Sequence, residues 1–158
     1  MCIISLVDGN VTRGDKMKTG KDVLNSVIKT TQMGQLGIEA VLEFTRQPEL
    51  RQALRDQKKE YDQIEKEALR IADERQWQVK NLNPAVKGMA RMTTRMRVSG
   101  KDPDATIAAM MIQGNTRGSI KTLKNLHRYP ETTGRICAIS QRLLDCETDN
   151  ITQMQGFV

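Results

Sequence analysis

Apolar positions recur along the chain at helical rather than strand spacing. Gaps of three and four residues begin near residue 20, resume after 48, and return between 103 and 127 and again after 134. Such gaps place apolar side chains on one face of a helix, whereas a half-buried strand would alternate. The pattern therefore predicts four long helices and no sheet.

Each predicted helix carries a core-facing seam that is apolar at its ends and polar or small in its middle. The seam of the first helix comprises Leu24, Ile28, Thr31, Gln35, Ile38 and Leu42, and that of the second Leu50, Leu54, Gln57, Tyr61, Ile64, Ala68 and Ile71. The third comprises Ala105, Ala108, Ile112, Asn115, Ser119, Leu123 and Leu126, and the fourth Ile136, Ile139, Leu143, Cys146 and Asn150. Polar residues at mid-seam predict a polar layer inside the bundle.

Local signals mark where the helices begin. Thr19 and Asp22 have the spacing of a capping box, and Asp102-Pro103 has the composition of a helix start. Pro48 suits a first helical position, because the missing N–H would have no intrahelical partner there. The turn before Pro48 is short enough to require an antiparallel hairpin.

The third long helix does not follow the second directly. Residues 75–83 read as a loop, and a shorter helix over about 84–98 lies before Asp102. Two hairpins joined by one long crossover are typical of the ferritin-like version of the four-helix bundle. We therefore predict an all-α ferritin-like bundle over 17–158 with a short extra helix in the crossover between the second and third long helices. Residues 1–16 lack helical periodicity and are predicted to be a poorly ordered extension.

Composition agrees with a helical core. Only 3% of the 158 residues are aromatic and nine are methionine, which favours aliphatic helix packing over strands. Three cysteines without a C-x-x-C spacing indicate neither a zinc knuckle nor a disulfide framework, so free thiols are expected. No stretch has the length or apolarity of a membrane span or signal peptide, and we expect a soluble cytoplasmic protein.

The net charge of +6 is concentrated in one segment. Residues 75–101 contain seven lysines and arginines and no acidic residue. Within this segment Met89, Met92 and Met96 form one stripe of the predicted helix 84–98, and cations form a second. We expect the methionines to cover the bundle as a lid while the cations stay in water. The alternative is a surface for an acidic partner, to which the following residues contribute: Lys87, Arg91, Arg95, Arg97 and Lys101.

Other candidate chemistry is sparse. The glycines at 34, 37, 114 and 118 match neither a phosphate loop nor a dinucleotide fingerprint, and they are better explained as points of close helix approach. His127 is the only histidine, and it falls at the predicted end of the third helix. No Ser/His/Asp or Cys/His catalytic group is indicated, so an enzyme is not expected.

The stretch KDVLNSVIKTTQMGQLGIEAVLEFTRQPELRQALRDQKKEYDQIEKEA resembles bacterial ferritin-like four-helix-bundle proteins of unknown function. The resemblance is best over residues 20–75, weaker over 102–153 and absent over 1–16. In ferritin-like metalloproteins, two helices each provide a Glu and the other two each provide a Glu-x-x-His motif at mid-bundle.

By resemblance, the metal-ligand positions fall at Gln35, Glu60, Gln63, Thr116, Cys146 and Asp149. Of these, only Glu60 keeps the residue type that the metal-binding pattern requires, and one histidine cannot supply two Glu-x-x-His motifs. The resemblance therefore implies a degenerate site with no metal and no cofactor. Glu60 is the one acid that a buried polar layer could hold, with Gln35 or Gln63 as its partner.

These observations favour a non-catalytic bundle that serves as a binding or assembly module, with a homo-oligomer as one form it could take. A ferritin-like metal-binding protein with an atypical site is the first alternative. Binding of nucleic acid or an anionic surface through the basic helix 84–98 is the second. Nucleic acid is the less favoured partner, because the segment offers no aromatic residue for base stacking and no reading motif.

Overall fold

The computed structural model describes residues 17–131 and 133–158, except for the side chains of Lys87 and Arg91, and these residues form five helices and no strand. The extension predicted for residues 1–16 lies outside the described residues. The helices are α1 (Gly20–Leu42), α2 (Pro48–Glu74), α3 (Ala85–Arg97), α4 (Pro103–Arg128) and α5 (Arg135–Gln155). The all-α class and the extra helix in the crossover are confirmed.

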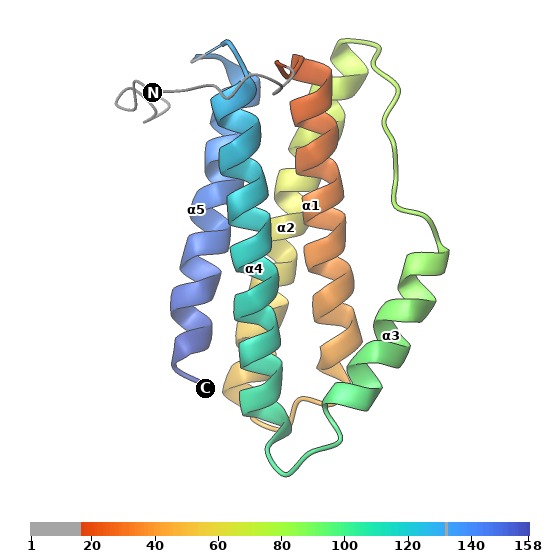
Figure 1. Cartoon of the computed structure of the whole chain (residues 1–158), viewed down its shortest axis with the longest axis vertical. Helices are drawn as coiled ribbons and strands as arrows, with labels where there is room; N and C mark the ends of the chain where they lie inside the picture. The colour runs from red at the N-terminus through yellow and green to blue at the C-terminus, as the bar shows by residue number, and fades with distance from the viewer. Residues whose placement is uncertain (1–16, 132) are drawn as a thin grey trace.

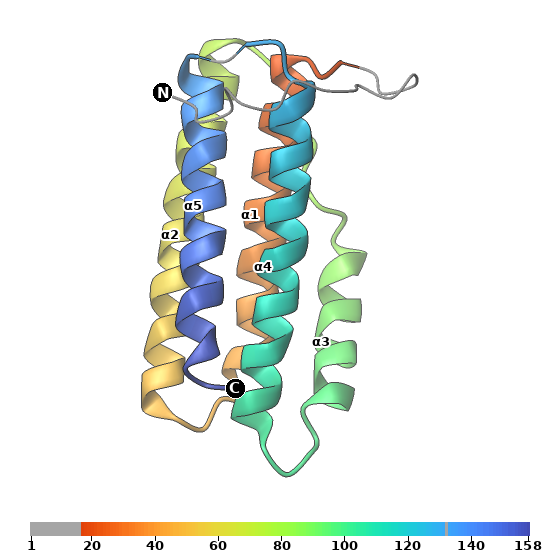
Figure 2. The ribbon, with the colours of Figure 1, turned by 60° about the vertical axis from the view of Figure 1, so that its left-hand side comes forward.

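Four of the helices lie side by side as a bundle (Figures 1 and 2). α1 and α2 form one antiparallel hairpin, and α4 and α5 form the other. The connection after α2 runs back along the length of the bundle, so α2 and α4 point in the same direction (Figure 1). The Asn125 side-chain N–H donates to Ser26 Oγ at 2.6 Å, which ties α4 to α1. No helix in the described part of the chain has the length and apolarity needed to cross a membrane.

Hydrogen bonds confirm the predicted helix starts at Thr19 and Asp102, and the start at Pro48 is confirmed by the first residue of α2. Thr19 and Asp22 exchange the two bonds of a capping box, at 3.1 and 3.2 Å. Asp102 accepts from the Ala105 backbone N–H at 3.1 Å at the start of α4. α5 begins after Gly134, whose φ of 102° is a conformation that glycine adopts without the steric cost of a Cβ.

A buried carboxylate joins the two hairpins at one end of the bundle. Asp104, in the first turn of α4, is only 4% exposed. Its two oxygens accept from the backbone N–H groups of Arg46 at 2.8 Å and Gln47 at 3.0 Å, in the turn between α1 and α2. Backbone groups in that turn have no helical partners, so Asp104 satisfies donors that would otherwise lose hydrogen bonds on burial.

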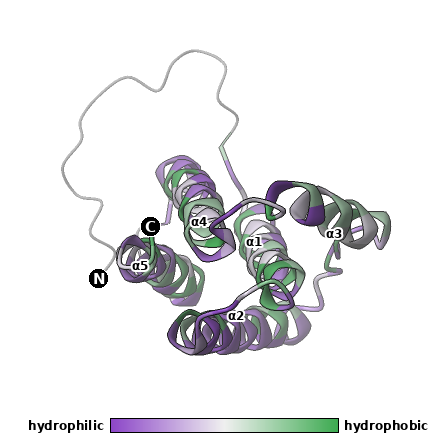
Figure 3. Cartoon of the chain, turned by 90° about the horizontal axis from the view of Figure 1, so that it is seen from below, coloured by the Kyte–Doolittle hydropathy of each residue, from purple (hydrophilic) through white to green (hydrophobic). Residues whose placement is uncertain are grey.

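The core is built from the seams of α2 and α5 largely as predicted. Every residue of these two predicted seams is buried. In α1 and α4 the prediction is wrong for Leu123, which is 37% exposed, and holds only in part for the half-buried seam residues Gln35, Leu42, Ala105, Ile112 and Ser119. Seen along the bundle in Figure 3, the apolar faces of the four long helices turn toward one another.

Gly34 explains why Gln35 lies outside the core although Leu24, Ile28, Thr31 and Ile38 of the same predicted seam are buried. A Cβ at this position would fall 2.5 Å from the Tyr61 ring, so the absence of a side chain lets α1 approach α2 over that ring. With Gly34 facing Tyr61, the next residue, Gln35, is turned toward the edge of the interface. Close approach is therefore confirmed at Gly34, whereas a Cβ at Gly37 or Gly114 would meet nothing within 4 Å.

α3 packs beside α1 on the outside of the four-helix bundle (Figures 1 and 3). The buried residues that face the bundle are Thr94, near the C-terminal end of α3, and Val98, just after the helix ends. Each is 5% exposed. Upstream, the Lys80 and Leu82 backbone N–H groups donate to the side chains of Asn25 and Gln32, both at 3.1 Å. The connection is thus fastened to α1 before α3 begins.

Candidate functional site

A hydrogen-bonded polar layer lies inside the bundle at mid-height. The Tyr61 hydroxyl donates to Asn115 Oδ1 at 2.6 Å, and the Asn150 amide donates to the same oxygen at 3.2 Å. The Asn115 amide in turn donates to the Met111 backbone carbonyl at 2.8 Å. Burial raises the pKa of Tyr61, so its hydroxyl keeps its proton and remains a donor. The layer links α2, α4 and α5.

Glu147 extends the polar layer but is poorly satisfied. Its side chain is 1% exposed, and its Oε2 atom has no hydrogen-bond partner in the described part of the chain. Burial raises the pKa of the carboxyl group to about 8, although Lys121 acts in the opposite direction. The carboxyl group is therefore mostly protonated at neutral pH. It occupies the space that a side chain at residue 118 would fill, since a Cβ on Gly118 would collide with Glu147 Oε1.

The residues predicted from the metal-ligand pattern do not converge. Gln35 donates to Glu65 Oε2 at 2.5 Å on the α1–α2 side of the bundle. Thr116 and Asp149 are exposed, and the Thr116 hydroxyl donates to the Ile112 backbone carbonyl. Among the described residues no group of three or more His, Cys, Asp and Glu side chains is placed to hold a metal ion.

Glu60 has a different partner from the one expected. Arg142 of α5 donates to Glu60 Oε1 at 2.8 and 3.0 Å, to Glu67 Oε2 at 3.1 Å and to Gln63 Oε1 at 3.2 Å. The Glu60 side chain is 40% exposed, so the prediction of a buried layer with Gln35 or Gln63 is wrong. The reason is that an arginine on the facing helix offers a charged, planar donor that an amide cannot match. Glu60 and Gln63 form part of an α2–α5 clamp.

Sequence reasoning recovered part of the buried layer and missed its acid. Asn115, Tyr61 and Asn150 all belong to the predicted seams, and all three are buried. The burial of Glu147 was not predicted, because Glu147 stands next to the predicted seam residue Cys146 instead of in the seam. No histidine or second buried acid close to it in the sequence suggests a site. The available signal was Gly118, which opens α4 toward α5 where an ordinary helical residue would close the gap.

The cysteines divide into two cases. Cys146 is a free, buried thiol, and burial raises its pKa to about 12, which leaves it protonated and unreactive. Cys137 is disulfide-bonded, so the expectation of free thiols is wrong for that residue. The Cys146 thiol is therefore not placed as a nucleophile.

α3 presents the opposite face from the one predicted. Met89, Met92 and Met96 are 71%, 70% and 74% exposed, so the expectation of a methionine lid on the bundle is wrong. The physical reason is that α3 touches the bundle near its C-terminal end through Thr94 and Val98, on the opposite side of the helix from the methionines. Single surface methionines are common, but three in one stripe form a contiguous apolar surface.

The predicted binding cations border this methionine stripe. Arg95, Arg97 and Lys101 are exposed. At 100° per residue, Arg95 and Arg97 fall on either side of the stripe. Lys87 and Arg91 belong to α3, but their side chains are outside the described residues. The surface formed by the methionine stripe with Arg95, Arg97 and Lys101 is called the α3 surface below.

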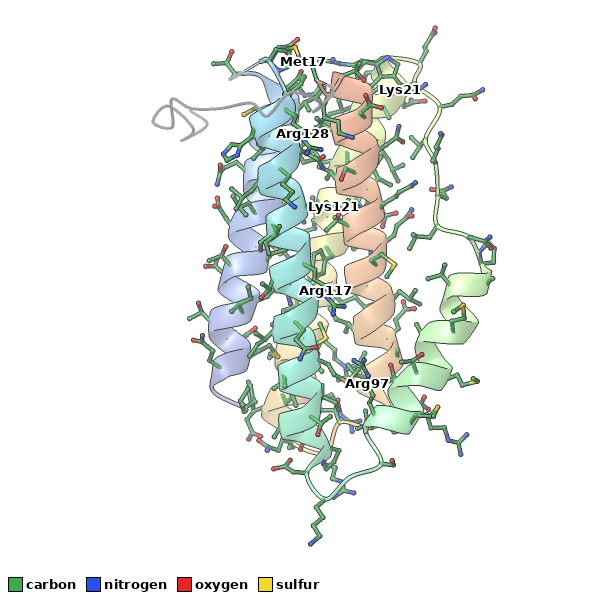
Figure 4. All side chains as sticks on the ribbon, viewed as in Figure 1. Met17, Lys21, Arg97, Arg117, Lys121 and Arg128 are labelled. Carbon is green, nitrogen blue, oxygen red and sulfur yellow. The ribbon has the colours of Figure 1, made fainter. Side chains whose placement is uncertain are left out.

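Further cations gather on the neighbouring face. Arg117, Lys121 and Arg128 follow one another along α4 in Figure 4, with Lys21 at the start of α1 and Arg97 at the end of α3 on the same side. The pKa of Lys121 is lowered mainly by burial, and also by its like-charged neighbours Lys29 and Lys18. Between residues 105 and 130 the chain has no acidic residue. This face adds to the positive potential around α3.

Comparison of the chain with family models, with curated proteins and with solved structures finds no significant match.

Proposed function

We propose that the chain is a non-catalytic helical bundle of ferritin-like topology that binds an anionic lipid surface through the α3 surface. The observation that carries the proposal is the orientation of α3: its methionines point to solvent while its bundle contacts lie on the opposite side. Exposed apolar side chains bordered by exposed arginines are the pattern of a helix that lies in a membrane interface.

The chemistry of the α3 surface favours lipid over the other acidic partners. A phosphate backbone would pair with Arg95 and Arg97 but offers no apolar volume for three methionines. Headgroups and acyl chains provide negative charge and apolar volume side by side, at the depth that an interfacial helix reaches. The seven cations of residues 75–101, with no acid between them, and the cation-rich face of α4 would draw the protein toward an anionic surface from a distance.

The ferritin-like part of the proposal rests on topology. Two antiparallel hairpins joined by a crossover that runs the length of the bundle are the arrangement expected for that superfamily. The resemblance of residues 20–75 supports the same assignment. The scattered positions of Gln35, Glu60, Thr116 and Asp149 support a role that does not depend on a di-metal centre.

Vesicle flotation tests this function. The protein is mixed with vesicles of phosphatidylcholine alone or with 30% phosphatidylserine, and the bound fraction is measured from about 50 to 300 mM salt. We expect binding to the anionic vesicles alone, weakening as salt screens the charges. The triple variant Arg95→Gln, Arg97→Gln and Lys101→Gln should lower the partition coefficient about a hundredfold, since each cation near such a surface contributes about 1 kcal/mol.

A charge-matched variant separates the α3 surface from net charge. Arg55→Gln, Lys59→Gln and Arg70→Gln remove three exposed cations from α2 and should leave binding nearly unchanged. Met89→Ser, Met92→Ser and Met96→Ser should weaken binding at every salt concentration without loss of fold. Equal binding to neutral vesicles, equal loss in both charge variants, or binding to DNA or to a second copy instead of lipid would each overturn the proposal.

A further inference from the structure

A polar pocket lies on the other side of α1 from the α4 face, where α1, α2 and the connection to α3 meet. Its volume is about 270 Å³, and it is lined by the following residues: Gln32, Gln35, Leu36, Glu39, Glu65, Asn81 and Leu82. That volume is just below the usual range for small-molecule sites and suits only a compact ligand. The pocket belongs neither to the buried layer around Asn115 nor to the α3 surface.

Glu65, which lines the pocket, differs from four other acids of α2, each of which pairs with a cation. Glu60 and Glu67 pair with Arg142, Asp62 with Lys66, and Glu74 with Arg135. Glu65 makes no ion pair with any described side chain; its oxygens accept from amides instead, Oε1 from Gln32 at 2.8 Å and Oε2 from Gln35 at 2.5 Å. Neutral amides fix the position of the carboxylate but leave its charge uncompensated.

The rest of the lining is complementary to a small cation with a short apolar body. Leu36 is 6% exposed and Leu82 is half-buried, and together they provide apolar wall. Of the two acids in the lining, Glu39 is already paired with Lys58 at 3.2 Å, so Glu65 is the one without a cation among the side chains that the structure describes. A carboxylate held half-buried between amides favours an ammonium group that can replace its lost water.

Hydrogen bonds across the pocket also attach the connection to the bundle. Gln32 Nε2 donates to Asn81 Oδ1 at 3.1 Å while Gln32 Oε1 accepts from the Leu82 backbone N–H at 3.1 Å. The same Gln32 donates to Glu65, so one side chain fixes both the acid and the wall opposite it. The polar groups are therefore positioned before any ligand arrives, which lowers the entropy lost on binding.

We propose that this pocket binds a small organic cation, an alkylammonium or diamine, with its ammonium group on the Glu65 carboxylate and its carbon chain against Leu36 and Leu82. The proposal is independent of lipid binding by α3. A bound ligand would also stabilise the connection before α3. Asn81 and Leu82 would then contact the ligand as well as Gln32.

Titration calorimetry and amide NMR with butane-1,4-diamine test the proposal at low salt. We expect saturable binding of one molecule per chain, with the largest shifts at the backbone amides of Asn81 and Leu82. Glu65→Gln keeps an oxygen to accept from the amides and removes the charge, so affinity should fall about tenfold or more. The matched variant Asp62→Asn removes an exposed acid from the same helix and should leave affinity unchanged.

Two further probes decide between a cation site and an unspecific cleft. Butane-1,4-diol has the same carbon chain without charge and should bind at least tenfold more weakly, and succinate should not bind. The proposal is overturned by absence of saturable diamine binding, by equal affinity in Glu65→Gln, by equal binding of the diol, or by shifts that map to the acids of α5 instead of the connection. Circular dichroism of each variant excludes loss of fold as the cause.

Discussion

Glu147 of α5 lies against the backbone of Gly118 of α4, in the space where any larger residue would place its Cβ. Glu147 is 1% exposed, so its side chain cannot move into solvent to make room for a larger residue at position 118. The two residues fix the spacing of α4 and α5 at the level of the polar layer.

Gly118→Ala should destabilise the protein by about 1–3 kcal/mol, since the new methyl group displaces a buried side chain. Urea unfolding followed by circular dichroism measures the change. Gly114→Ala on the same helix is the control: a Cβ there meets nothing within 4 Å, and higher helix propensity should stabilise by up to about 1 kcal/mol. In a Glu147→Ala background the penalty of Gly118→Ala should largely vanish, and an unchanged penalty would show that another contact is responsible.

Glu147→Gln should stabilise the protein increasingly as the pH rises. The pKa is about 8 in the folded chain against 4.5 for an ordinary glutamic acid, so between these values the folded state holds a proton that the unfolded state has lost. The native acid therefore costs stability progressively from pH 4.5 to 8, by up to about 5 kcal/mol if the full difference of 3.5 pKa units is expressed. Gln removes that dependence.

Unfolding midpoints at pH 5 and pH 9 check this expectation. The gain from Glu147→Gln should be small at pH 5 and largest near pH 9. Parallel pH profiles for the native protein and the variant would mean that Glu147 is ionised in the folded chain and would contradict the raised pKa.

Arg142→Gln should cost more than a typical surface ion pair. Arg142 connects α5 to Glu60 and Glu67 of α2, and all three side chains are between 37% and 40% exposed, so screening limits the loss to about 1 kcal/mol. Glu60→Gln leaves Glu67 in place and should cost less. Thermal unfolding at 50 and 500 mM salt measures both, with Lys66→Gln in the exposed Asp62 pair as a near-neutral control. If the loss of stability is the same at both salt concentrations, Arg142 stabilises the bundle by packing and not by its charge.

Tyr61→Phe should cost about 1–2 kcal/mol while keeping the ring that packs over Gly34. The Tyr61 hydroxyl makes the shorter of the two hydrogen bonds to Asn115 Oδ1. Removing it leaves that buried oxygen with only the 3.2 Å bond from Asn150. Chemical denaturation gives the value. No loss at all would indicate that water replaces the hydroxyl.

Protein loaded with ferrous iron should retain no stoichiometric di-iron centre. The positions that the ferritin-like resemblance assigns to metal ligands carry residues with separate partners, Gln35 bonding to Glu65 and Glu60 to Arg142. Elemental analysis after desalting and a ferroxidase assay provide the measurement. Two retained irons per chain would restore the metal-binding alternative.

Helical periodicity was sufficient to predict the bundle, its hairpins and most of its core. It failed where a glycine controls the contact. Gly34 brings α1 onto the Tyr61 ring and moves Gln35 out of the interior, and Gly118 admits Glu147. Helical periodicity identifies positions with apolar side chains. It does not identify a glycine whose missing side chain lets another residue enter the space.

The orientation of α3 could not be read from its own sequence. An amphipathic pattern says that the methionines share a face, not that the bundle covers that face. Thr94 and Val98 make the bundle contact instead, and a short helix that touches its neighbour near one end can leave its apolar stripe in solvent. Likewise, the partner of Glu60 depended on which α5 residue faces it across 82 positions of sequence separation.

The Asp104 joint has a consequence for how the molecule opens. The amide protons of Arg46 and Gln47 lie in a turn, where exchange with solvent is ordinarily fast, yet both are held by a carboxylate that is itself 4% exposed. Releasing them requires the two hairpins to part at that end, which would leave the acid without its donors. Exchange at these two amides should therefore report the same opening free energy as the centre of the bundle, so that a turn records the cooperative unfolding of the whole.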